Sequence, residues 1–415
     1  MFLQAFTFLI VLYFFFRNKI DFLLLFLGST ILYNWQIIYG TIWVPPYSFS
    51  ASEESKIIVL IILAILIIFT FINDLLLQDK EEKSYKIEKE KDDFNFFIVL
   101  TIFSYLATLY AIINAGQFLL SEKREFLSAS GLPYFFITYY PAAMAFLFFM
   151  ISKRYKYALV AFIPLLFYLL VGYRAAIVIT IVFSFFVFYY NSKIFTIQIY
   201  KPIIFVISTF VFFVAYKFSY IGLKAGDLYT IANIIEQDPR FGSYIEFFIY
   251  AFFSAEFGQA ASNLSITSSM DLSKEYSFIT TLLGSLPFID TLFGVSEEGS
   301  RFSTVIEAHA NPGFSYGLGG TIWGEIYQAG GFSGVLIFSI LVIFLIFQYN
   351  LSFLRSKEKF SLFAYFVGFL AFYIHRNDFV LFVAHIKNIL FLSLLVFAIL
   401  WIFKNKISMN PFKTR

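Results

Sequence analysis

Cysteine is absent from this chain of 415 residues, and histidine occurs only three times. The lack of cysteine excludes disulfide bonds, thiolate nucleophiles and cysteine metal sites. The three histidines, His309, His375 and His385, stand far apart in the sequence, so a zinc site is not expected. Phosphate-binding loops, dinucleotide-binding glycine motifs, zinc-protease motifs and nucleophile elbows are also missing. We therefore expect no metal, no cofactor and none of the common soluble-enzyme mechanisms.

Charged residues are scarce, at 14% of the chain, whereas hydrophobic residues make up 60% and aromatic residues 22%. A typical soluble domain is about half apolar and about a quarter charged. The 61 phenylalanines suit helices that face lipid. The net charge of +3 is small and no basic patch carries interleaved aromatic residues, so nucleic acid is not an expected partner. The composition predicts an all-α, polytopic integral membrane protein that contacts membrane lipids.

Apolar runs long enough to cross a bilayer, about 20 residues with some tolerance, recur along the chain. Two more apolar segments, 245–257 and 278–293, fit helices that lie on the membrane or re-enter it. If both cross instead, the count rises to about 13. We predict about 11 transmembrane helices, with a range of about 10 to 13, at residues 2–16, 22–42, 57–77, 94–115, 133–151, 158–172, 175–190, 203–217, 331–349, 361–374 and 380–403.

Positive residues gather on alternate connections between the predicted spans. One side receives the charged linker at 78–93 and the C-terminal tail, and in all it holds 19 of the 30 Lys and Arg residues. The positive-inside rule places this side in the cytoplasm, so the N-terminus is external and the C-terminus is cytoplasmic. We divide the chain into an N-terminal bundle of about eight spans, one large external loop and a C-terminal group of about three spans, at residues 1–217, 218–330 and 331–415.

A polar, glycine-rich stretch, Arg301–Gly331, ends the large loop and leads into the next predicted span. Glycines such as Gly317 and Gly320 let the backbone approach a ligand closely, although an ordinary polar loop is the alternative. His309 could serve as a general acid or base, or be structural. Glu325 enters a membrane helix, which favours either an arginine partner or the role of base for an acceptor hydroxyl. The sequence leaves the choice between His309 and Glu325 open.

Four arginines fall on the predicted external side. Arg174 and Arg376 stand in short connections between spans, and Arg240 and Arg301 lie in the large loop. Arginine presents a rigid fork of donors to phosphate oxygens and does not lose its proton. For Arg174 the alternative is a charge that only marks the end of a span. Together the four predict an anionic ligand at the membrane surface, and a lipid pyrophosphate is the natural candidate.

Several local patterns accompany this architecture. Gly172–Tyr173–Arg174 opens a span, Gly324–Glu325 and Gly330–Gly331 lead into another, and 15 residues separate Arg301 from Gly317. With them the chain resembles the bacterial oligosaccharide repeat-unit (O-antigen, Wzy-like) polymerases, relatives of the O-antigen ligases. The spacing from Arg301 is described for arginine-bearing loops of some polymerases.

Two features depart from the pattern of these families. In the ligases a small polar residue directly follows the histidine, whereas Ala310 follows His309 here. The arginine-to-glycine spacing is not repeated from Arg174 or Arg240. The first departure weakens the interpretation as a ligase. The second weakens a scheme in which two such loops transfer the substrate.

The resemblance implies a metal-independent glycosyltransferase related to the membrane-embedded C-type glycosyltransferases. Its substrate would be an undecaprenyl-pyrophosphate-linked oligosaccharide, polymerised at the periplasmic face of the inner membrane into a surface polysaccharide such as the O-antigen of lipopolysaccharide. His309 and Glu325 would be catalytic, and the four arginines would bind the pyrophosphate. A chain-length regulator and a flippase would be partners. An O-antigen-type ligase and a lipid-linked sugar flippase or other transporter are the alternatives.

Overall fold

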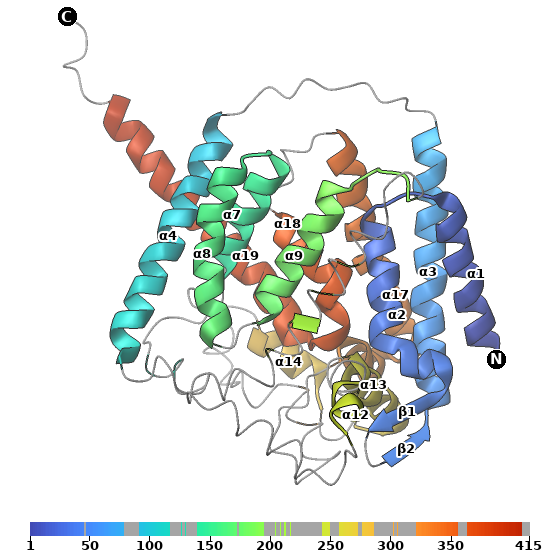
Figure 1. Ribbon diagram of the computed structural model, residues 1–415. Coiled ribbons are helices and arrows are strands. Elements are labelled where there is room, and N and C mark those ends of the chain that lie inside the picture. The colour runs from blue at the N-terminus through green and yellow to red at the C-terminus, as the bar shows by residue number, and fades with distance from the viewer. Residues whose placement is uncertain are drawn as a thin grey trace, which may run out of the picture. The chain divides into compact units, whose positions relative to one another are not determined.

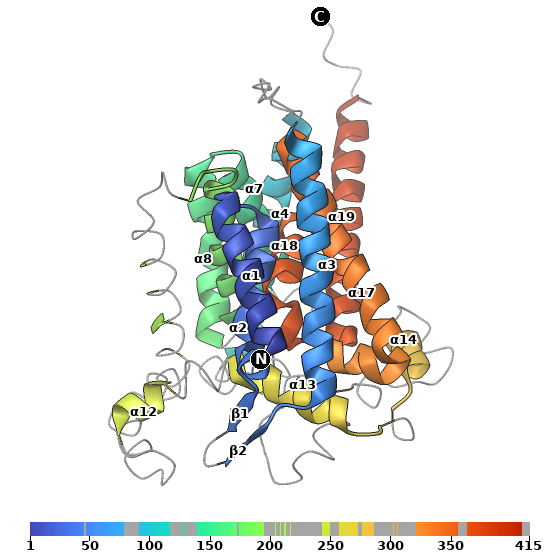
Figure 2. The same ribbon diagram turned by 90° about the vertical axis from the view of Figure 1, so that its right-hand side faces the viewer.

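Figures 1 and 2 show the computed structural model of the chain, which is mostly helical. The chain divides into two compact units. Unit 1 comprises Met1–Lys83, Phe185–Leu354 and Val367–Ala384, and unit 2 comprises Ser84–Ser184, Arg355–Phe366 and His385–Arg415. The structure describes residues 1–44, 47–78, 91–116, 126, 129, 139–171, 174–194, 204, 208, 211, 212, 216, 243–249, 257–272, 276–285, 302, 305, 321–355 and 363–408.

Helices make up most of both units. Unit 1 contains α1 (Phe2–Arg17), α2 (Phe22–Tyr39), α3 (Glu53–Gln78), α12 (Tyr244–Ile249), α13 (Gln259–Ser269), α14 (Phe278–Ser285), nearly all of α17 (Ile322–Arg355), the π-helix η4 (Phe369–Tyr373) and the 3₁₀-helix η5 (Ile374–Arg376). Unit 2 contains, wholly or for the most part, α4 (Lys91–Ala115), α7 (Tyr140–Ile151), α8 (Tyr155–Val171), α9 (Arg174–Phe188), α18 (Ala364–Gly368) and α19 (Phe379–Ser408).

Among the described residues, five helical segments are long and apolar enough to cross a membrane: Phe22–Tyr39, Glu53–Leu76, Phe94–Ala115, Ile322–Leu354 and Phe379–Ile402. Four shorter apolar segments, within α1, α7, α8 and α9, accompany them. The chain is thus a multi-pass membrane protein, as its composition predicts. The count of about 11 spans stays a prediction, and nearly all of the predicted span at 203–217 lies outside the described residues.

Two predicted spans differ from the elements that the structure contains. Helix α17 already begins at Ile322 and bends at Gly331, where φ is 59°, so the predicted span at 331–349 is only its later part. The predicted span at 361–374 contains α18 followed by η4 and η5. This stretch is therefore interrupted by π and 3₁₀ turns, which often mark functional regions of membrane helices.

A small β-hairpin corrects the prediction of an all-α chain. Strands β1 (Thr41–Val44) and β2 (Tyr47–Ser50) pair antiparallel, with Thr41 opposite Ser50 and Val44 opposite Tyr47. Helix α2 ends at Tyr39 and is capped by Gly40, whose φ of 93° lies in the left-handed region that glycine adopts without strain. Residues 41–42, the end of the span predicted at 22–42, therefore belong to β1.

Helices α1, α2 and α3 of unit 1 contact one another, and a buried ion-pair network joins one end of the three. The guanidinium of Arg17 donates to the carboxylates of Asp21 and Asp74, and Tyr13 Oη donates to Asp74 over 2.9 Å. Asp21 also accepts the backbone N–H of Leu24 and so caps the start of α2. Two carboxylates thus compensate one buried arginine, and one of them also caps a helix.

The large loop predicted at 218–330 contributes three described helices to unit 1. Helices α12 and α14 fall within or beside the two apolar segments predicted to lie on the membrane. Helix α13 was not predicted, because its sequence QAASNLSITSS has no apolar stripe, yet most of it is buried. It contacts α2, α3 and β1, and Figure 2 shows it crossing the end of α2 and α3 beside the hairpin.

In unit 2, helices α4, α7 and α8 pack against one another. The ring of Phe97 stacks on that of Phe148, with 4.0 Å between their centroids. Tyr105 Oη donates to the carbonyl of Val160. Such close helix contacts through aromatic and polar groups are how membrane bundles are held together without a hydrophobic driving force between helices.

Candidate functional site

The structure describes three of the eight residues predicted to form the site. Arg240, Arg301, His309, Gly317 and Gly320 lie outside the described residues. Glu325 and Arg376 belong to unit 1, whereas Arg174 is the first residue of α9 in unit 2. Arg174 and Arg376 are both half-buried. Glu325 is fully buried, and the candidate site is built around it.

Glu325 stands in the first turn of α17. The helix starts after Thr321, whose carbonyl accepts the N–H of Glu325 over 3.0 Å. The carboxylate therefore lies before the bend at Gly331, at the end of α17 that faces α13 rather than along its apolar length. A carboxylate with no exposed surface needs hydrogen-bond donors to offset the loss of water.

The carboxylate of Glu325 lies at the N-terminus of α19. Its Oε2 accepts the backbone N–H of Phe379, the first residue of α19, over 2.6 Å. Asp378 caps the same helix end, because its Oδ1 accepts the N–H of Leu381 over 3.0 Å. The free N–H groups and the dipole of a 30-residue helix both favour negative charge at this end.

Tyr276 supplies the second donor to Glu325. Its hydroxyl, which comes from the segment between α13 and α14, donates to Oε1. The sequence favoured either an arginine partner for Glu325 or the role of base, and among the described residues Tyr276 and the N–H of Phe379 are its donors. Burial, together with the neighbouring carboxylate, raises the pKa of the Tyr276 phenol far above its usual range. The phenol therefore keeps its proton and remains a donor.

Tyr276 is itself held by a small apolar cluster. Its ring meets the ring of Phe302 edge to face, with 4.8 Å between centroids and 64° between planes. Leu272 completes the buried part of the cluster, and Phe278 and Val305 pack against it. Phe302 has no exposed surface and directly follows Arg301 in the sequence.

A second set of bonds fixes the first turn of α17. Trp323 Nε1 donates to Nδ1 of His375 over 2.9 Å, and Nε2 of His375 lies 3.2 Å from Thr30 Oγ1. Indole nitrogen is only a donor, so Nδ1 carries no proton and the imidazole donates from Nε2. Thr30 in turn donates to the carbonyl of Phe26 over 2.7 Å. The fully buried His375 is thus neutral and structural in this arrangement.

Helix α13 crosses α17 at Gly324. A Cβ atom at this position would lie 2.2 Å from Thr267 Oγ1, so only glycine allows the two helices to approach this closely. One turn later, Gln328 donates to the carbonyls of Thr267 and Met270 and accepts the N–H of Leu272. Trp323, Gly324 and Glu325 therefore dock the first turn of α17 on three different segments, and Gln328 adds to the contact with α13.

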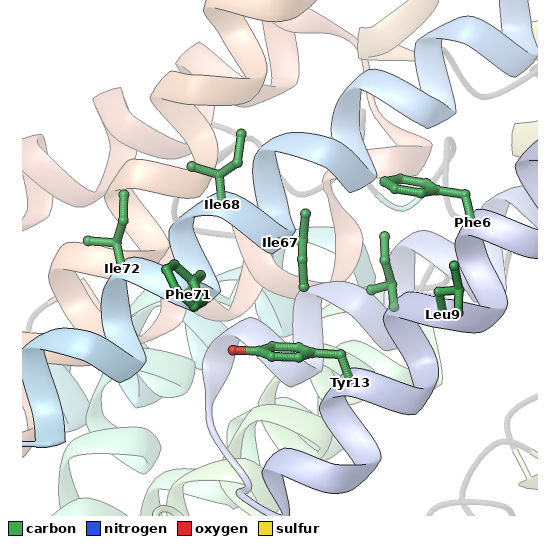
Figure 3. A pocket seen from close by; sticks show the side chains of 8 residues that line it. Phe6, Leu9, Tyr13, Ile67, Ile68, Phe71 and Ile72 are labelled. Atoms are coloured by element: carbon green, nitrogen blue, oxygen red, sulfur yellow. The ribbon is translucent and has the colours of Figure 1, made fainter.

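The described residues contain no cluster of three or more His, Asp or Glu side chains that could hold a metal ion. An apolar groove of about 410 Å³ lies between α1 and α3, and Figure 3 shows its lining by side chains such as Phe6, Leu9, Ile68 and Phe71. The one polar side-chain group of this lining is the hydroxyl of Tyr13, which donates to Asp74.

Sequence reasoning found Glu325 but missed the residues that surround it. Tyr276 carries no signal, because it is one of 28 tyrosines and lies outside any motif. Trp323 stands two residues before Glu325 and could have been noticed as a polar-tipped aromatic in a first helical turn. His375 was considered as one of three scattered histidines, and its partner Thr30 is 345 residues away.

Comparison with known proteins identifies the family. A family model with the description "Putative O-antigen polymerase" matches residues 3–237, which is more than half of the chain. Arg174 falls within the matched residues, whereas Glu325 and Arg376 follow them. Neither the curated proteins nor the solved structures provide a match. With its apolar helices and the family match over residues 3–237, the chain belongs to the O-antigen polymerase family of polysaccharide biosynthesis.

Proposed function

We propose that this protein joins lipid-linked oligosaccharide repeat units into a surface polysaccharide such as O-antigen. Membership of the polymerase family supports the reaction class. The observation that carries the proposal within the chain is Glu325, a fully buried carboxylate with two hydrogen-bond donors at the start of a membrane helix. A buried ionisable group in a membrane protein is by default a candidate for function.

In the proposed reaction, a hydroxyl of the acceptor sugar attacks the anomeric carbon of the donor chain. The bond between that carbon and the pyrophosphate oxygen breaks, and the lipid pyrophosphate leaves with the electron pair. A new glycosidic bond forms, and the hydroxyl proton passes to the carboxylate of Glu325. General base catalysis of this kind contributes about 10²- to 10⁴-fold to a rate. His309 is the second candidate for this role.

The departing pyrophosphate requires positive charge. We assign this task to Arg174, Arg240, Arg301 and Arg376, because guanidinium groups bind phosphate oxygens through two parallel hydrogen bonds. Charge stabilisation at the leaving group is among the largest contributions to enzymatic rates. Gly317 and Gly320 would let the backbone of the loop approach the substrate.

The proposed site faces the periplasm. The distribution of Lys and Arg between the predicted connections supports an external N-terminus and large loop and a cytoplasmic C-terminus in the bacterial inner membrane. An undecaprenyl-pyrophosphate-linked repeat unit would then reach the site after a flippase has turned it outward. A chain-length regulator would act on the same growing polymer.

Deletion of the gene from its host tests the proposal. A polymerase mutant is expected to display single repeat units at the cell surface in place of long chains. Complementation by the wild type restores the long chains. Complementation by Glu53→Gln restores them as well, because Glu53 is an exposed carboxylate that pairs only with Lys56 among the described residues. Complete loss of attached glycan would instead indicate a ligase, and loss of all external repeat units would indicate a flippase.

A further inference from the structure

Tyr276 is the one side chain in the described part of the structure that donates a hydrogen bond to the carboxylate of Glu325. It reaches Oε1, while the backbone N–H of Phe379 reaches Oε2, so the two donors hold the two oxygens of the carboxylate separately. Such an arrangement fixes both the position and the rotation of the carboxylate plane. A base must be held this way to meet the proton that it removes.

We infer that Tyr276 is the positioning residue of the catalytic carboxylate, orienting Glu325 toward the proton that it accepts. The inference rests on the proposed role of Glu325 as the base. A hydrogen bond to a carboxylate favours the charged form, whereas burial and a neighbouring carboxylate favour the neutral form. The hydrogen bond from Tyr276 thus opposes the effect of burial on the ionisation of the Glu325 carboxylate.

The other groups that face Glu325 do not replace this donor. In the described part of the chain, the titratable groups that act on Glu325 are Tyr276 and Asp378. Asp378 carries the same charge as Glu325, and one of its carboxylate oxygens caps α19. The N–H of Phe379 is backbone and is present in every variant. Removal of the Tyr276 hydroxyl therefore removes a hydrogen bond that favours the ionised form of Glu325.

Phe302 supports the ring of Tyr276. The two rings pack edge to face within a cluster from which water is excluded, and Phe302 is fully buried. Phe302 directly follows Arg301 in the chain, so the Tyr276 ring packs on a residue that is adjacent in sequence to a proposed pyrophosphate ligand.

The test is the pH dependence of polymerisation by the purified, membrane-reconstituted protein with a defined lipid-linked repeat unit. Activity of the wild type falls as Glu325 becomes protonated. In Tyr276→Phe the protonated form is favoured, so activity is lost at higher pH than in the wild type. A hydrogen bond to a charged group corresponds to a shift of roughly one to two pH units. Phenylalanine keeps the ring against Phe302, and activity recovers toward the wild-type rate at alkaline pH.

Tyr39→Phe, which alters an exposed tyrosine at the end of α2, serves as the matched control and leaves the profile unchanged. Should Tyr276→Phe fail to fold, Phe302→Leu retains the hydroxyl and is expected to move the acidic limb in the same direction by a smaller amount. A uniform loss of rate at all pH values, with no shift of the acidic limb in the folded variant, would overturn the inference. A wild-type protein without polymerase activity would contradict the proposed function instead.

Discussion

Glu325 and Phe379 are 54 residues apart in the chain, yet the carboxylate of the first accepts the backbone N–H of the second over 2.6 Å. This bond ties the start of α17 to the start of α19, two helices that each contain a candidate membrane span. The bond between Trp323 and His375 joins the same two regions a few residues away. The carboxylate therefore stands at a junction with little freedom to move.

Glu325→Gln is expected to reduce polymerisation by about 100-fold or more, because glutamine cannot take up the proton of the acceptor hydroxyl. The amide oxygen can still accept from Phe379 or Tyr276, so the protein should remain inserted and folded. Rates measured with the purified protein, alongside Glu53→Gln at an exposed position, check this expectation. Wild-type rates for the glutamine variant would contradict the role of Glu325 as the base. A loss of rate in His309→Ala would then identify His309 as the base.

Arg174→Ala and Arg301→Ala should each lower polymer formation by about 100-fold or more while the protein stays in the membrane, since each removes positive charge from the proposed pyrophosphate site. Glycan ladders from complemented cells and the membrane content of each variant provide the readout. Lys56→Ala, which alters a partly exposed cation paired with Glu53, is the control. Ladders of normal length from both arginine variants would contradict the assignment of these residues.

Gly324→Ala should destabilise the protein by about 1–3 kcal/mol, because the added methyl group meets Thr267 Oγ1 at 2.2 Å. Thermal unfolding in detergent measures the change. The double variant Gly324→Ala/Thr267→Ala removes the obstructing oxygen and should regain part of the stability. Gly330→Ala is the matched control, since no atom lies within 4 Å of the new methyl group. Equal melting temperatures for the two alanine variants would argue against the close crossing of α13 and α17.

Trp323→Phe leaves Nδ1 of the buried His375 without its donor, which is expected to cost about 1–3 kcal/mol of stability. The ring of phenylalanine retains most of the packing, so the loss reports the hydrogen bond. Trp401→Phe changes an exposed tryptophan of α19 and should unfold at the wild-type temperature. If both variants unfold like the wild type, the Trp323–His375 bond does not contribute to the junction.

Asp21→Ala breaks the buried ion pair with Arg17 and removes the cap of α2, so a destabilisation of about 3 kcal/mol or more is expected. Glu53→Ala breaks an ion pair whose carboxylate is largely exposed, and the expected change is below about 1 kcal/mol. Unfolding curves of the two variants under identical conditions compare them. A similar small change in both would show that the burial of Arg17 is compensated elsewhere.

The helical membrane architecture could be predicted from the sequence because apolar runs of span length dominate it. Glu325 could also be singled out, since a carboxylate at the entrance of a membrane helix is costly without a partner. Its donors could not be predicted. Tyr276 and Phe379 lie 49 and 54 residues away, and no periodicity relates them to Glu325.

Helix α13 and the β-hairpin were missed for a related reason. The side chains of α13 are mainly small and polar, so hydrophobic periodicity gives no signal. Residues such as Ser265 and Ser268 are nevertheless buried, because they bond to Ser52 ahead of α3. The hairpin strands have only four residues each, too few for an alternating pattern to stand out from the adjoining span.

The central claim is that this protein elongates lipid-linked glycans with Glu325 as the base. Its most direct test is incubation of the purified, reconstituted protein with a single defined undecaprenyl-pyrophosphate-linked repeat unit in the presence of EDTA. The account predicts products of increasing length from the wild type and none above background from Glu325→Gln. Failure of the wild type to lengthen the repeat unit, or equal chain growth by both proteins, would contradict it.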